Sequence, residues 1–194
     1  MELSFSALGA LLRETLRDPQ AAARRVMAVD LPDGARWQAL ALVVVLSVLL
    51  VQVAMMLTAG PEVMGGVWRS ALLQGGVLVV TVLAVHHIGR GFGGTGTLRD
   101  AVILVAWLQF VTLCFQVAQI FVLLIAPPLA SLVAIASIAV FLWLLVSFVQ
   151  ALHGFRSRGL VLLGLVVSFF ALAFALSLVL AVLGFEVPGG FDDV

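Results

Sequence analysis

Long apolar runs separated by short polar stretches dominate the pattern of this chain. A helix needs about 20 mostly apolar residues to cross the hydrocarbon core of a bilayer. Five stretches meet this requirement, at roughly 37–58, 67–88, 101–126, 128–150 and 159–184. The pattern therefore predicts an all-α integral membrane protein whose five transmembrane helices form one domain over residues 37–184.

The third and fourth runs are separated only by Pro127 and Pro128. Proline lacks a backbone N–H and disfavours helix in the residue before it. The pair predicts a tight turn, so that the two runs form a helical hairpin. The alternative is one long kinked helix, but about 50 apolar residues exceed a single crossing.

Polar and apolar residues alternate at helical spacing in the first segment, residues 1–36. Phe5, Leu8 and Leu12 share one helix face, and Asp18 before a proline is typical of the start of a second helix. Amphipathic helices that carry arginine lie in the membrane interface. We therefore expect two short interfacial helices on the cytoplasmic side, with a plain linker as the alternative.

The distribution of charges predicts the orientation of the chain. With a cytoplasmic N-terminus, the cytoplasmic segments hold nine of the ten basic residues: Arg13, Arg17, Arg24, Arg25, Arg36, Arg90, Arg99, Arg156 and Arg158. The other side holds Arg69 and four acids: Glu62, Glu186, Asp192 and Asp193. The positive-inside rule then predicts N-in and C-out, with a short acidic outward tail at 185–194.

Composition excludes several classes of protein. Hydrophobic residues make up 63% of the chain and charged residues 10%, too few to cover a water-facing surface. The net charge is zero, which argues against nucleic-acid binding. A single cysteine, Cys114, allows no internal disulfide and no cysteine metal site.

The stretch GFGGTGTLRD at residues 91–100 contains the spacing G-x-G-x-x-G. A dinucleotide site would need a preceding strand and an acid about 20 residues later. Here a transmembrane run precedes the glycines, and TLCFQVAQ near residues 112–119 has no acid. We interpret the stretch as a short connection, with Thr97 as N-cap of the next helix and Asp100 in its first turn.

Span three carries four polar residues at spacings of 3, 4 and 3, on one helix face: Gln109, Thr112, Gln116 and Gln119. Polar groups are costly in lipid, so this face should point into the helix bundle. The favoured interpretation is hydrogen bonding between helices, with Gln52 and Gln74 as partners. The alternative is a polar pathway for a substrate.

Candidate chemistry is sparse. The three histidines, His86, His87 and His153, fall at cytoplasmic ends of spans, where we expect contact with headgroups or helix C-termini. No acid or cysteine nearby supports a metal site. A catalytic nucleophile needs a base and an orienting group, and no motif supplies them. No enzyme, cofactor or metal is therefore predicted.

Three segments carry a family resemblance: RDPQAAARRVMAVDLP, GFGGTGTLRDAVILVAWLQF and LVSFVQALHGFRSRGLVLLGL. They resemble the Ypt/Rab-interacting-protein (Yip) membrane-domain family, in its bacterial branch. The resemblance implies five spans, a cytoplasmic N-terminus and no enzymatic activity. Eukaryotic members are linked to Rab-type GTPases, vesicle traffic and membrane shaping, but no GTPase-recognition element maps onto this chain.

These observations favour a non-enzymatic, multi-pass protein of the bacterial inner membrane that acts as an interaction or membrane-organising module. Four arginines on its cytoplasmic face are the expected contacts with anionic headgroups or an acidic partner: Arg90, Arg99, Arg156 and Arg158. Besides lipids, the expected partners are another protein or a second copy of the chain. The alternative function is a permease for a lipid or small neutral molecule that uses the polar face of span three.

Overall fold

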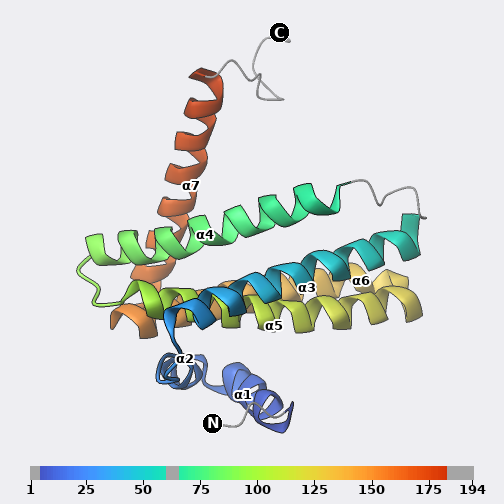
Figure 1. Ribbon diagram of the computed structural model, residues 1–194, viewed down its shortest axis with the longest axis horizontal. Coiled ribbons are helices and arrows are strands. Elements are labelled where there is room, and N and C mark those ends of the chain that lie inside the picture. The colour runs from blue at the N-terminus through green and yellow to red at the C-terminus, as the bar shows by residue number, and fades with distance from the viewer. Residues whose placement is uncertain (1–4, 60–65, 183–194) are drawn as a thin grey trace. The chain divides into compact units, whose positions relative to one another are not determined.

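The computed structural model describes residues 5–59 and 66–182 (Figure 1), so the predicted tail at 185–194 lies outside the described residues. The described residues form seven α-helices: α1 (Phe5–Arg17), α2 (Pro19–Met27), α3 (Asp33–Ala59), α4 (Val67–Gly91), α5 (Leu98–Ile125), α6 (Pro127–His153) and α7 (Arg158–Val182). They divide into two units, Met1–Arg156 and Ser157–Val194. The predicted all-α class is confirmed.

Four helices, α3 to α6, are long and apolar enough to cross a membrane. They lie at the positions of the first four predicted spans. The second unit contains α7, which forms where the fifth span was predicted and is apolar over Arg158–Ser168. Four candidate crossings are thus shown, whereas the fifth crossing and the N-in, C-out orientation stay predictions.

A single residue, Ala126, separates α5 from α6. Its N–H donates to the carbonyl of Val122 at 2.8 Å, which closes α5, and Pro127 then opens α6. Proline suits the first turn of a helix because the N–H it lacks would have no partner there. The predicted hairpin is confirmed, and the single kinked helix is not what the chain forms.

The two predicted N-terminal helices are α1 and α2. Asp18 caps α2 by accepting a hydrogen bond from the N–H of Ala21 at 3.0 Å. Leu11 of α1 and Ala22 and Ala23 of α2 are buried in the same core as α5 and α6. The apolar faces that the sequence pattern assigned to the membrane surface therefore pack against protein.

Helix α5 occupies the centre of the first unit, in contact with α2, α3, α4 and α6. Residues 101–109 are all buried, so every face of this part of α5 meets another helix. The buried part of α6 is its last turns, from Leu144 to His153. The core therefore gathers where α5 begins and α6 ends, which we call the loop end of the bundle.

Away from the loop end the helices expose large apolar side chains. Trp68 is 83% exposed and Ile125 82%, and Leu72, Phe121 and Ile135 are also exposed. In a membrane protein such side chains face lipid, so this exposure fits four membrane-crossing helices.

Candidate functional site at the loop end

Three connecting segments meet the helix termini at the loop end: the α2–α3 linker at residues 28–32, the α4–α5 loop at 92–97, and the turn after α6 at 154–156. Backbone groups in such segments lack helical partners and need other hydrogen bonds. Side chains from α3 and α6 supply many of these bonds, as the next two clusters show.

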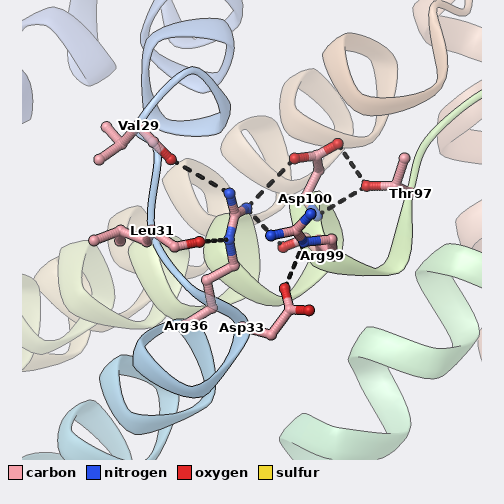
Figure 2. A network of polar contacts seen from close by, with 7 residues as sticks. All are labelled: Val29, Leu31, Asp33, Arg36, Thr97, Arg99 and Asp100. Atoms are coloured by element: carbon pink, nitrogen blue, oxygen red, sulfur yellow. Dashed lines mark hydrogen bonds and ion pairs between the residues drawn. The ribbon is translucent and has the colours of Figure 1, made fainter.

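Figure 2 shows the first cluster, which is centred on Arg36 near the start of α3. The side chain of Arg36 is only 7% exposed. Its Nε donates to the carbonyl of Leu31 at 3.1 Å, and its Nη2 donates to that of Val29 at 3.3 Å. Its Nη1 donates to the carbonyl of Arg99 at 3.2 Å and lies 3.5 Å from Oδ1 of Asp100. Arg36 thus joins the α2–α3 linker to the first turn of α5.

Three further hydrogen bonds in Figure 2 belong to this junction. Arg99 donates from Nε to Oδ1 of Asp33, the first residue of α3. Thr97 caps α5 by accepting from the N–H of Asp100 at 3.2 Å, and its hydroxyl donates to Oδ2 of Asp100 at 2.6 Å. The predicted cap is confirmed. Two ion pairs connect α3 to α5, one with its arginine on α3 and the other with its arginine on α5.

The second cluster is centred on His153, the last residue of α6, which is 3% exposed. Its Nδ1 lies 3.2 Å from the backbone nitrogen of Gly96, and its Nε2 lies 3.0 Å from the carbonyl oxygen of Val85 on α4. The N–H of Thr95 donates to the carbonyl of His153 at 3.4 Å. One residue of α6 therefore binds both α4 and the loop that follows it.

Glycines make room for this imidazole ring. A Cβ added to Gly89 would lie 2.2 Å from Nε2 of His153, and one added to Gly94 would lie 2.4 Å from Nδ1. A Cβ at Gly96 would also meet the ring, whereas Gly91 has open space around it. The glycine stretch is thus a socket for a histidine, with Gly93 at φ +84° turning the chain.

The expectation that His153 meets headgroups is wrong, because its ring is enclosed by protein, between the carbonyl of Val85 on α4 and the N–H of Gly96. His86 is also buried, and its Nδ1 has no hydrogen-bond partner, whereas His87 is exposed. Among the described residues, no group of three or more metal-ligating side chains comes together. The three histidines therefore have different surroundings despite their similar places in the sequence.

Two long-range hydrogen bonds attach α1 and α2 to the bundle, and the sequence pattern gave no sign of either. The indole N–H of Trp107 donates to the hydroxyl of Thr15 at 3.0 Å, in buried surroundings. The amide of Gln20 donates to Oε1 of Gln150 at 2.7 Å. Both N-terminal helices are therefore fixed by polar contacts as well as by apolar packing.

The four predicted contact arginines differ in their surroundings. Arg90 in the last turn of α4 is exposed, and so is Arg156 after α6. Arg99 is exposed but already bound to Asp33. Arg158 begins α7 and is exposed, and it belongs to the second unit. The structure thus keeps their charges on the surface and gives one of them a carboxylate partner.

The four residues of the predicted polar face in span three also differ. The amide of Gln109 is buried and donates to the hydroxyl of Ser47 on α3 at 3.0 Å. Thr112 donates to the carbonyl of Leu108 in its own helix at 2.9 Å. Gln116 has a buried Oε1 without a hydrogen-bond partner, and Gln119 is half-buried. One of the four thus makes a bond between helices.

Beside Gln109 runs a groove of about 460 Å³ between α4, α5 and α6. Its lining includes the apolar residues Leu78, Val105 and Phe141. Its polar lining residues are Ser70, Gln74, Thr81 and Gln109. Most of the polar face of span three therefore lies outside this groove.

Comparison with known proteins gives one match. The family model described as the Yip1 domain matches residues 13–181. No curated protein and no solved structure matches the chain. The matched range begins within α1 and extends into α7, so it includes the last part of α1, all of α2 and the four apolar helices that can cross a membrane. The chain therefore belongs to the Yip1 domain family of multi-pass membrane proteins.

Proposed function

We propose that this chain is a non-enzymatic module of the bacterial inner membrane whose loop end faces the cytoplasm and binds anionic lipid headgroups. Membership of the Yip1 domain family supports a membrane role without catalysis. The contacts we propose are Arg90, Arg156 and Arg158, together with the part of Arg99 that Asp33 leaves accessible. Each exposed arginine near a membrane surface contributes about 1 kcal/mol of attraction to anionic lipid.

The observation that carries this proposal is the contrast between Arg36 and the exposed arginines. The guanidinium of Arg36 donates hydrogen bonds to three carbonyls and a carboxylate inside the protein. Arg90 and Arg156 instead hold their charges on the surface of the same end of the bundle. Helices α1 and α2, which pack against the same core, carry two further exposed arginines, Arg13 and Arg24.

The test compares lipid binding by the double variant Arg156→Gln/Arg158→Gln with that of the unchanged protein. Both are reconstituted in lipid discs with defined fractions of phosphatidylglycerol, and bound lipid is counted by native mass spectrometry. Loss of two charges should weaken binding of the anionic lipid by about 2 kcal/mol, or about thirtyfold.

The matched control is the double variant Arg156→Lys/Arg158→Lys, which keeps both charges and should retain most of the binding. Equal retention of phosphatidylglycerol by the glutamine variant and the unchanged protein would contradict the proposal. Enrichment of one specific protein, lost in the glutamine variant, would replace lipid by a protein partner at the same face.

A second candidate function, a permease for a lipid or small neutral molecule, gains support from the groove between α4, α5 and α6. The hydrogen bond from Gln109 to Ser47 argues against a permease, because it engages this amide in joining α5 to α3. Filling the groove by Leu78→Trp should abolish uptake of a neutral solute by proteoliposomes if this candidate is right, and unchanged uptake would remove it.

A further inference from the structure

The two ring nitrogens of His153 have opposite hydrogen-bonding roles. The nitrogen that faces the carbonyl oxygen of Val85, Nε2, must carry a hydrogen and donate. The nitrogen that faces the N–H of Gly96, Nδ1, must lack a hydrogen and accept. Only the neutral imidazole with its hydrogen on Nε2 satisfies both contacts.

The socket leaves the His153 ring little room to move if its charge changes. Gly89, Gly94 and Gly96 approach it so closely that even a methyl group at any of them would overlap the ring. On the remaining side, the ring of Phe155 stacks on that of His153 with centroids 5.5 Å apart. A new charge on the imidazole would therefore act on the groups already in contact with it.

The ionisable groups around the socket do not favour a positive ring. On α4, the nearby ionisable side chain is the buried His86, which supplies no negative charge. Residues 92–97 of the loop contain no ionisable side chain. On α5, the carboxylate of Asp100 accepts hydrogen bonds from Thr97 and Arg36. Arg99 is paired with Asp33.

Helix α2 packs on α6, and it presents Gln20, a neutral side chain, to Gln150. The cations of α2, Arg24 and Arg25, are exposed, and Arg25 is paired with Glu14 of α1. Among the described residues, no carboxylate binds either nitrogen of His153. An imidazolium in this socket would therefore lack a compensating anion.

We propose that His153 is a proton-sensitive lock on the α4–α5 loop. Protonation places a hydrogen on Nδ1, which turns the acceptor for the Gly96 N–H into a second donor and breaks that hydrogen bond. Because the socket disfavours a charged ring, the hydrogen bond holds while the imidazole is neutral and is lost only when acidification adds a proton to it. Release of the loop would change how Arg90 and the exposed Phe92, at its start, are presented.

The test measures hydrogen–deuterium exchange of residues 92–97 in the full chain in lipid discs, at about pH 8 and about pH 5. Protection is expressed relative to intrinsic rates, with the buried start of α5 as internal reference. Nitrogen NMR of the labelled imidazoles reports the protonation of His153 in the same samples. We expect protection of the loop to fall about tenfold as the ring becomes charged, as for loss of one buried hydrogen bond.

The decisive variant is His153→Asn, whose Oδ1 takes the place of Nδ1 and accepts from Gly96 without titrating. Its loop protection should be the same at both pH values, whereas the control His87→Asn should keep the pH dependence of the unchanged protein. A pH effect of equal size in His153→Asn would overturn the proposal. So would a ring that stays neutral at the lower pH, or one that becomes charged without any change in the loop. None of these results depends on lipid binding by the arginines.

Discussion

At the scale of single residues, ten arginines look alike in the sequence, yet Arg36 has surroundings that the others lack. A guanidinium presents five N–H donors in a fixed fork, so it can satisfy several acceptors at once. Arg36 does so for the carbonyls of Val29, Leu31 and Arg99. Arg36 therefore supplies hydrogen-bond donors to carbonyls of the α2–α3 linker that have no helical partner.

Arg36→Met should destabilise the protein by about 3 kcal/mol, because it removes the guanidinium donor from three carbonyls and from Oδ1 of Asp100. Arg36→Lys should recover only part of this loss, because an ammonium cannot reach all the acceptors of a guanidinium. The free energy of unfolding in lipid–detergent mixtures, measured by denaturant titration, tests both changes. The exposed Arg24→Gln is the control and should stay within about 0.5 kcal/mol. A loss of similar size in Arg24→Gln would refute the special role of Arg36.

His153 shows why part of the site could not be predicted from the sequence. It looks like His86 and His87, since all three lie near the ends of apolar runs. Its burial depends on three glycines from a segment about 60 residues earlier, which come close only after the helices pack. By contrast, Thr97 could be recognised as a cap because a cap contacts residues two or three positions ahead.

At the scale of helices, local chemistry predicted where the elements begin and end. Asp18, Thr97 and the two prolines at 127–128 mark helix starts in the structure as they did in the sequence. The exception is α3, which begins at Asp33 rather than at 37, where the apolar run starts. Its first turn is polar, and its contacts with Arg99 and with the linker keep it helical beyond the apolar stretch.

Contacts between helices were much harder to predict than their bounds. The hydrogen bond between Thr15 and Trp107 joins residues 92 positions apart, and that between Gln20 and Gln150 spans 130. No local pattern encodes such a pairing. The amphipathic face of α1 could be recognised, but whether it meets lipid or protein depends on these distant partners.

A double-mutant cycle tests the attachment of α1 to α5. Thr15→Val removes the acceptor and Trp107→Phe removes the donor, so the two changes should couple by about 1 kcal/mol in the free energy of unfolding. A matched cycle of Thr112→Val with Trp107→Phe should show almost no coupling, because Thr112 bonds to Leu108 of its own helix. Additive losses in the first cycle would mean that the observed hydrogen bond does not hold α1 in place.

At the scale of the whole molecule, α7 sets the number of membrane crossings. The positive-inside rule predicts that it does, because the arginines before it and the acids after it favour opposite sides. Four crossings would instead return the C-terminus to the side of the N-terminus. The number of crossings thus decides which surface the tail reaches.

Labelling of single cysteines distinguishes the two arrangements in intact cells. With Cys114→Ser as background, Ser157→Cys should react with a membrane-impermeant maleimide only after permeabilisation, and Asp192→Cys should react without it. Matching behaviour of both positions would show that α7 does not cross. Reaction of Ser157→Cys in intact cells would reverse the predicted orientation.

The one-residue connection between α5 and α6 has a consequence for how the protein is made. A membrane insertion machine usually has to move a hydrophilic loop across the bilayer between two successive helices. Here Ala126 and two prolines offer almost nothing hydrophilic to move, so neither helix needs to enter before the other. The pair can therefore leave the ribosome and partition into lipid as one unit.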